Sequence, residues 1–482
     1  MKNNNIFKIL FLLSTLDILS FVAFLYPAVG KIFFVILSIS FLFLILKKFE
    51  LGFLVLLVDL VIGSKGYLFF YQINDFKLSI RIAFFVIFML VWAGYLLVDF
   101  FKNKINPYKF YINNLERYWF VFFAFILLGV ANGFLNNQLS YVYQDFNGWL
   151  YFLLIFPITW FIAKKNTDFS KQIFEIILAS LLFVSLKSLF VLYYFSHDFL
   201  NSIPLVYKWI RDTGVGEITR MESGFVRVFF QSHIYLLFGI FGCLINLQEK
   251  IIKKWLLFFI LTIFFAVFIL SFSRTNWLGL AFGLLFYFSS FFLKKNFKKL
   301  TTSVFVVFSA FIFSVLLILA LIKFPFPKQN SDFSPISIAE RATDSGAAVS
   351  SRWKLLDPLN EGIIKNFVLG KGFGATIEYS SDDPRVLANN PEGRYKAFAF
   401  EWGWHDILYK LGIFGFLSYV YLLGRVAILN YLQSFSSKKS LILTLVIFSL
   451  FVMHIFSPYF NHPLGIGVIL LAYVNIKKPK II

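Results

Sequence analysis

The sequence contains little cysteine and little charge. One cysteine, Cys243, among 482 residues excludes intrachain disulfides and any cysteine-rich metal site. Only 15% of the residues are charged, whereas soluble domains carry about 25%. The sequence also lacks a Walker-type phosphate loop, a dinucleotide-binding glycine fingerprint, a metal-ligand cluster and an internal repeat. These absences exclude an ordinary soluble enzyme, and they give no indication of a metal or any other cofactor.

Apolar residues dominate what is present. The chain is 59% hydrophobic and 21% aromatic, and a helix needs about 20 apolar residues to cross a bilayer. We therefore expect an all-α polytopic membrane protein with about 12–14 transmembrane helices. The apolar runs lie at 6–27, 29–46, 51–71, 81–101, 118–135, 146–163, 172–196, 228–248, 255–272, 275–293, 302–322, 403–424, 440–457 and 462–476.

The net charge of +20 is distributed as expected for helices that cross the membrane in alternating directions. With the N-terminus in the cytosol, most Lys and Arg residues fall in cytosolic connections, as the positive-inside rule requires. The short outer loops carry only Lys31, Lys65, Lys77, Arg81 and Arg274. The charge therefore predicts that both termini are cytosolic. It does not indicate a nucleic-acid partner, although +20 would suggest one in a soluble protein.

One predicted outer segment, residues 324–400, is long enough to be a functional insertion rather than a connector. From about 350 to 368 its apolar residues recur at helical spacing, so we expect short amphipathic helices in this extracytoplasmic loop. We divide the chain into N-terminal membrane helices at 1–219, a central domain at 220–425 that includes the loop, and C-terminal membrane helices at 426–482.

Four basic residues are predicted at the same outer face: Arg227, Arg274, Arg352 and His405. Taken singly, each has a structural explanation at the membrane interface or in a solvated loop. Taken as a set, they suit a phosphate leaving group and an acceptor hydroxyl. Arginine binds phosphate with a planar fork of donors, and histidine accepts a proton near neutral pH.

Polar residues inside predicted spans form a second class of candidates. Asp17 and Asp59 lie near mid-span, and Lys187 lies in the outer part of the seventh span. Because a charge in a bilayer is costly, each should be paired or face water. Either acid with Lys187 is a plausible ion pair, and a transport path is an equal alternative.

Three motifs occur in order along the central domain. Ser271–Leu280 reads SFSRTNWLGL, Ser351-Arg352 precedes the VLGKGFG stretch at 368–374, and His405 begins HDILYKLGIFG. Their order, spacing and loop placement resemble the shared domain of the O-antigen ligase and O-antigen polymerase family, over roughly 220–425. The residue after the histidine is usually Asn in that family and is Asp406 here.

The resemblance implies a metal-independent, inverting membrane glycosyltransferase of the bacterial cytoplasmic membrane. The donor would be a glycan on undecaprenyl diphosphate, and the acceptor a lipid A–core sugar, another lipid-linked glycan or another hydroxyl. Arg227, Arg274 and Arg352 would bind the diphosphate, and His405 would be the base. Glu401, one helical turn before His405, would orient the histidine ring, and Asp406 would affect how the histidine or the acceptor is held. Arg220 is the alternative to Arg227.

Two rival functions remain open at this point. The charges within spans would suit a transporter or flippase for a lipid-linked saccharide, although such proteins usually show repeats. A member of the family that only binds partners is the other. The motifs do not choose between a ligase and a polymerase, because both share them.

Overall fold

The computed structural model describes residues 4–74, 76–165, 170–199, 202–221, 224–248, 254–329, 347–382, 384–388 and 390–476. Two compact units emerge, each formed from two stretches of the chain. The first takes Met1–Lys104 and Lys165–Arg341, and the second takes Ile105–Lys164 and Ala342–Ile482. The domain limits 1–219, 220–425 and 426–482 remain a prediction from the sequence.

The first unit consists of helices and two β-hairpins. Its elements are α1 (Asn4–Leu25), α2 (Pro27–Lys47), α3 (Phe49–Gly63), β1 (Phe70–Ile73), β2 (Phe76–Ser79), α4 (Ile80–Phe101), α9 (Ser170–Ser196), α10 (Ile203–Asp212), β3 (Gly216–Arg220), β4 (Val226–Phe230), η2 (Gln231–Tyr235), α11 (Leu236–Leu247), α12 (Lys254–Leu270), α13 (Arg274–Leu293) and α14 (Phe297–Ile322). Both strand pairs are antiparallel.

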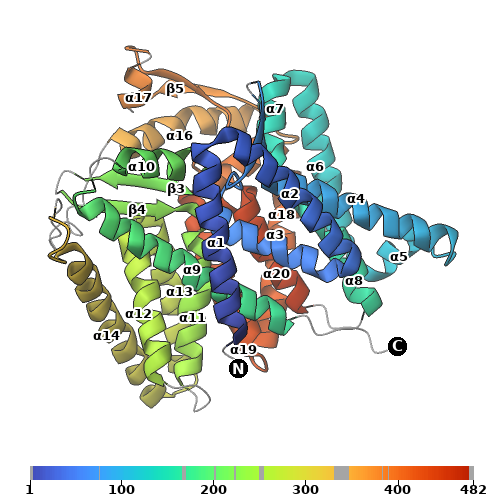
Figure 1. Ribbon diagram of the computed structural model, residues 1–482. Coiled ribbons are helices and arrows are strands. Elements are labelled where there is room, and N and C mark those ends of the chain that lie inside the picture. The colour runs from blue at the N-terminus through green and yellow to red at the C-terminus, as the bar shows by residue number, and fades with distance from the viewer. Residues whose placement is uncertain are drawn as a thin grey trace. The chain divides into compact units, whose positions relative to one another are not determined.

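Helices α11 to α14 run side by side in this unit (Figure 1). Helix α12 contacts α11, α13 and α14, and every residue from 261 to 270 is buried. The sequence of this part of the helix has no polar stripe, as expected where a helix is enclosed on all sides. Helix α9 contacts α1, α3 and β4, and so connects the N-terminal helices with the β3–β4 hairpin.

Helix α3 is shorter than the span predicted at 51–71, because it ends at Gly63. Ser64 then has a φ of +49°. The Arg81 guanidinium donates to the carbonyl oxygens of Ser64 (2.6 Å) and Asp59 (3.0 Å) and to the Asp59 carboxylate (2.5 Å). A cation that binds the last carbonyls of a helix stabilises its C-terminus. This interaction ends the predicted span early and pairs Asp59 with a partner other than Lys187.

The other acid, Asp17, pairs with Lys187, one of the two pairings that the sequence allowed. Lys187 Nζ lies 2.6 Å from Asp17 Oδ1, and it also lies 4.3 Å from the centroid of the Trp209 ring. Asp17 and Asp59 therefore each have a cationic partner, which is how charges within a membrane are ordinarily stabilised. These contacts provide a structural explanation for the residues that motivated the transport alternative.

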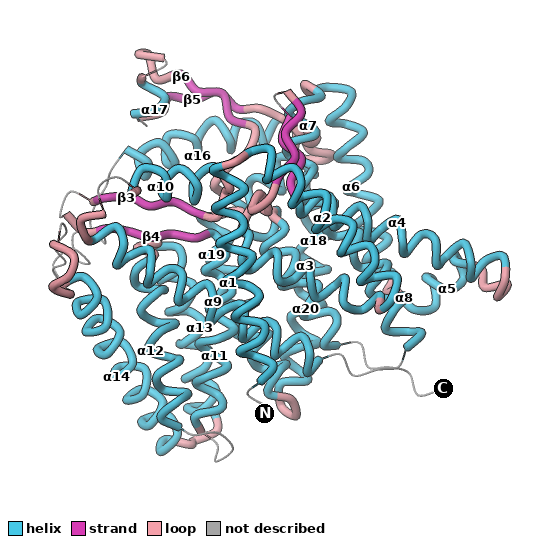
Figure 2. The backbone as a smooth tube through the Cα atoms, viewed as in Figure 1, coloured by secondary structure: helices cyan, strands magenta, loops and turns pink. Residues whose placement is uncertain are grey.

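The second unit consists of helices and one hairpin. Its elements are α5 (Pro107–Asn114), α6 (Arg117–Asn136), α7 (Leu139–Phe146), η1 (Asn147–Leu154), α8 (Ile155–Lys165), α16 (Ala347–Lys365), β5 (Ile377–Ser380), α17 (Pro384–Leu387), β6 (Arg394–Ala397), α18 (Gly403–Ser434), α19 (Lys438–Phe456), η3 (Tyr459–Asn461) and α20 (Pro463–Ile476). Figure 2 shows how little of the chain is strand.

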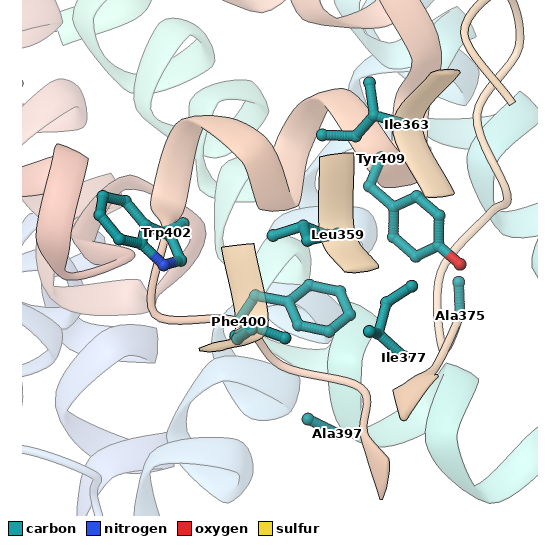
Figure 3. Packing of buried hydrophobic residues seen from close by; sticks show 9 residues of the cluster. Leu359, Ile363, Ala375, Ile377, Ala397, Phe400, Trp402 and Tyr409 are labelled. Carbon is teal, nitrogen blue, oxygen red and sulfur yellow. The ribbon is translucent and has the colours of Figure 1, made fainter. Parts of the chain in front are cut away.

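A hydrophobic cluster joins α16, the β5–β6 hairpin and the start of α18. Leu359 and Ile363 of α16 point toward Ile377, Phe400 and Tyr409, and Trp402 lies at one end of the group (Figure 3). The spacing of the apolar residues in α16 matches the amphipathic helix predicted near 350–368, which is confirmed at Ala347–Lys365. Within the predicted loop, residues 330–346 lie outside the described residues.

The helices confirm the predicted fold class of an all-α polytopic membrane protein. Within the described ranges, ten helical segments are long and apolar enough to cross a membrane. Three shorter apolar helices, Gln231–Leu247, Lys254–Leu270 and Pro463–Ile476, coincide with further predicted spans. The sequence predicts 12–14 spans, and the difference from ten arises from these shorter helices and from α3.

Candidate functional site

Arg227 lies on β4 of the first unit. Alternate residues of this strand are buried, and Arg227 is half-buried on the opposite face. Its Nε donates to the carbonyl oxygen of Ser271 at 2.8 Å, and its Cζ lies 5.0 Å from the centroid of the Phe229 ring. The hairpin arginine is therefore bonded to the turn that precedes α13.

The alternative arginine occupies a different place. Arg220 is opposite Val226 at the end of the hairpin nearest its turn, and it is exposed. Arg227 is opposite Thr219, one register position along the hairpin. The bond to Ser271 is thus made by the arginine that the sequence analysis preferred.

The turn between α12 and α13 places Arg274 at a helix N-terminus. Helix α12 ends at Leu270, Phe272 has a φ of +45°, and the Ser273 hydroxyl accepts from the backbone N–H of Asn276 at 3.4 Å. Arg274 is the first residue of α13 and is half-buried. The partial positive charge of a helix N-terminus adds to that of the guanidinium, so this position attracts anions.

An apolar groove begins one helical turn after Arg274. Its volume is about 480 Å³, and it is lined by residues of α12, α13 and α14. Trp277, three residues after Arg274, lines the groove, and Ala281 and Phe311 lie further along it. Because residues three apart share a face of a helix, the cationic position and the groove are neighbours.

In the second unit, Arg352 lies in the second turn of α16 and is half-exposed. It forms an ion pair with Glu401, which directly precedes Trp402. The Trp402 Nε1–H donates to the carbonyl oxygen of Arg352 at 2.9 Å. Two contacts therefore attach Arg352 to the segment that leads into α18. The sequence analysis gave Glu401 the role of orienting His405, whereas its ion pair here is with Arg352.

His405 lies in the first turn of α18 and also contacts Trp402. The centroids of the Trp402 and His405 rings are 5.9 Å apart at an interplanar angle of 73°. Trp353, which is exposed, packs edge-on against Trp402 with the centroids 5.2 Å apart. The buried indole of Trp402 thus contacts both the backbone of Arg352 and the ring of His405, so the structure brings these two predicted residues to one tryptophan.

The glycine motif at 370–374 forms a tight turn. Gly370, Gly372 and Gly374 have φ values of +72°, +85° and +74°. A side chain at Gly372 would collide with the backbone of Gly133 in α6, and one at Gly374 with the backbone of Val142 in α7. Glycine is required here both for its conformation and for the close approach of other backbones.

This turn fits into a kink in α18. Gly412 is non-helical, with a φ of 66°, and the Ile413 N–H donates to Phe367 outside the helix. The carbonyl oxygens of Tyr409 and Lys410, in the turn before the kink, accept hydrogen bonds from outside the helix. They accept from the N–H groups of Lys371 (2.8 Å) and Gly372 (3.0 Å). The glycine turn is therefore a structural part of the first two turns of α18.

The sequence analysis missed a buried charge cluster beside this turn. Lys410 Nζ lies 2.6 Å from Asp145 of α7 and 2.6 Å from Asp406 of α18. Asp406, the residue that departs from the family pattern, is thus paired with Lys410. The spacing of four between Asp406 and Lys410 is a signal for a helical ion pair. No local pattern points to Asp145, which is far away in the sequence.

These features describe a multi-pass helical membrane protein whose candidate residues are cationic. Two arginines lie near a helix N-terminus and an apolar groove in the first unit, and an arginine and a histidine flank a tryptophan in the second.

Residues 257–420 match the O-antigen ligase family, so the resemblance is confirmed and the chain contains an O-antigen ligase domain. Arg274, Arg352 and His405 lie within the matched residues. None of the curated proteins compared with the chain matches it. The domain supports a glycan-transfer role in O-antigen assembly, an enzyme of the glycosyltransferase type and lipid-linked glycan substrates. With the apolar helices, it supports a multi-pass protein of the bacterial inner membrane.

Proposed function

We propose that the protein transfers a glycan from undecaprenyl diphosphate to an acceptor hydroxyl at the outer face of the cytoplasmic membrane. The observation that carries this proposal is the O-antigen ligase match over 257–420, which includes Arg274, Arg352 and His405. The positive-inside pattern supports an outer position for these residues and cytosolic termini. The acceptor is a lipid A–core sugar in a ligase and another lipid-linked glycan in a polymerase.

The reaction needs a base for the acceptor and charge stabilisation for the leaving group. The acceptor oxygen attacks the anomeric carbon from the face opposite the diphosphate, and its proton passes to His405. The bond from the anomeric carbon to the diphosphate oxygen breaks, and the oxygen keeps the electron pair. General-base catalysis of this kind contributes about 10²–10⁴ in rate.

Each of the three arginines is proposed to bind diphosphate oxygens. Arg227 and Arg274 are supported by the hydrogen bond from Arg227 to Ser271 in the turn that precedes Arg274. Arg352 is supported by its attachment to Trp402, whose indole contacts His405. A guanidinium suits this role because it stays charged and donates through a planar fork. Removing one such donor to a developing charge costs about 10²–10³ in kcat.

The apolar groove supports a lipid-linked donor. It starts at Trp277, one turn from Arg274, and it is lined by apolar side chains of three helices. An isoprenoid chain whose diphosphate is bound by Arg274 would find an apolar surface along α13. We assign the groove to that chain.

The decisive test is complementation of a strain that lacks the gene. His405→Ala should restore no glycan transfer while the protein remains inserted in the membrane. Arg352→Lys should also be impaired, since lysine keeps the charge but loses the fork. Full transfer by His405→Ala would refute the base assignment.

The glycans of the deletion strain separate the two reactions of this family. Single-repeat lipopolysaccharide without longer chains would indicate a lost polymerase. Unmodified core with accumulated lipid-linked polymer would indicate a lost ligase.

A further inference from the structure

Lys410 is a buried lysine between two carboxylates. Its side chain is 1% exposed, and those of Asp145 and Asp406 are 7% and 4% exposed. Both Nζ–carboxylate distances are 2.6 Å. Charges in such a place are retained only when they are paired and hydrogen-bonded, and removal of one partner leaves the others uncompensated. The three side chains therefore depend on one another.

Each carboxylate also holds a further element. Asp145 Oδ2 accepts from the backbone N–H of Gly374 at 2.7 Å, and Asp406 Oδ2 accepts from Asn461 Nδ2 at 2.5 Å. Lys410 Nζ lies 5.4 Å from the centroid of the Phe400 ring. The cluster thus connects α18 with the end of α7, the glycine turn, the segment before α18 and η3.

The position of this cluster differs from that of an ordinary stabilising ion pair. Asp406 follows His405 directly, and Lys410 lies one turn later, before the non-helical Gly412. Because the kink separates residues 403–411 from the rest of α18, helix continuity alone does not orient His405. Residues 403–411 are held instead by contacts outside the helix. These are the contacts of Lys410 and Asp406 and the two hydrogen bonds from the glycine turn to the carbonyls of Tyr409 and Lys410.

We propose that Lys410, through Asp145 and Asp406, is a positioning residue that sets the orientation of His405. This inference rests on the proposed function, since it takes His405 as the base. Lys410 itself does not touch the substrate. Its role is to hold the first turns of α18 against the glycine turn, so that the histidine ring keeps a single orientation.

The first experiment measures kcat and KM per folded molecule. The purified protein is assayed with the undecaprenyl-diphosphate-linked glycan extracted from the deletion strain. Lys410→Met should lower kcat at least about tenfold while KM for this donor changes less than about twofold, the pattern of a lost transition-state interaction. Lys410→Arg, which keeps the charge, should recover part of kcat and all of the folded protein.

Two matched variants separate positioning from general stability. Lys187→Met removes a buried lysine that pairs with Asp17 at the same 2.6 Å, but in the first unit. It should reduce the yield of folded protein and leave kcat per folded molecule unchanged. Asp406→Asn removes one of the two carboxylates beside Lys410, so it should lower kcat per folded molecule in the same direction as Lys410→Met. Equal kcat losses for Lys410→Met and Lys187→Met would overturn the proposal.

The second experiment does not depend on activity. Hydrogen exchange followed by mass spectrometry should show faster exchange of amides 371–374 and 403–411 in Lys410→Met. A segment that loses buried contacts opens locally at a lower free-energy cost, so its amides exchange faster. Lys187→Met should leave these amides protected. If Lys410→Met does not fold, the same two measurements, hydrogen exchange and kcat, are made on Lys410→Arg and test the proposal. Unchanged exchange together with unchanged kcat would overturn positioning, whereas an active His405→Ala would overturn only the base assignment.

Discussion

Arg227 donates from Nε to the carbonyl oxygen of Ser271, across 2.8 Å and 44 residues of sequence. This bond connects a β-hairpin to the turn that begins α13 at Arg274. Two arginines that the sequence places in separate segments thereby belong to one local structure.

Arg227→Lys should lower transfer about tenfold to a hundredfold, because lysine cannot both bond Ser271 and present a fork to a phosphate. The measurement is the glycan ladder of the complemented deletion strain, with membrane levels of the protein determined by blotting. Arg220→Lys is the comparison. If Arg220→Lys is the more damaging of the two, the hairpin arginine has been misassigned.

Gly372→Ala should unfold the protein at lower temperature. An alanine at a φ of +85° costs about 1–2 kcal/mol, and its methyl group would also meet the backbone of Gly133. Gly424→Ala in α18 is the control, since a methyl group there meets nothing within 4 Å. It should be neutral or stabilising, as alanine favours helix over glycine by about 1 kcal/mol. The unfolding temperatures of the two variants are measured in detergent. Equal changes for Gly372→Ala and Gly424→Ala would contradict the requirement for glycine in the turn.

Ala281→Trp should raise KM for the lipid-linked donor about tenfold and leave kcat little changed, because the indole would occupy the groove that is proposed to bind the isoprenoid chain. Leu285→Trp is the matched control. Leu285 is on the same helix and 62% exposed, and it does not line the groove. Similar KM values for the two variants would remove the groove from donor binding.

Ionised Asp382 should contribute to the stability of the second unit, and this contribution should be lost in acid. The Lys354 ammonium and the Ser350 hydroxyl donate to this carboxylate and hold its pKa below the usual value. A pKa lowered by folding means that the ionised group stabilises the fold above the unfolded-state pKa. This contribution is lost as the pH falls through the folded-state pKa.

Asp382→Asn should therefore be less stable than the original protein at pH 7, with a difference in Tm that shrinks as the pH falls below the unfolded-state pKa of the carboxyl group. Lys354→Met should remove the same contribution, so the two changes should be non-additive in a double-mutant cycle. A difference in Tm that persists unchanged at acid pH would show that ionisation of Asp382 is not its source.

The local features of the fold were predictable from the sequence. Apolar runs of about 20 residues identify membrane helices, and the apolar spacing near 350–368 identifies α16 at Ala347–Lys365. The motifs around Arg274, Arg352 and His405 also pointed to the family that the match over 257–420 supports. These signals are local because they depend on helical period and on short strings of residues.

Long-range pairings were decided only by the tertiary structure. Asp17 pairs with Lys187 and Asp59 with Arg81, although the sequence allowed either acid for Lys187. Arg81 also ends α3 at Gly63, before the apolar run ends.

The same holds near His405. The sequence by itself determined which segments are helical, where their apolar faces lie and which residues the family motifs mark. It did not determine that Lys410 meets Asp145, 265 residues away. Only folding brings these charges together, because the cost of burying a charge is met by whichever opposite charge the packed helices place beside it.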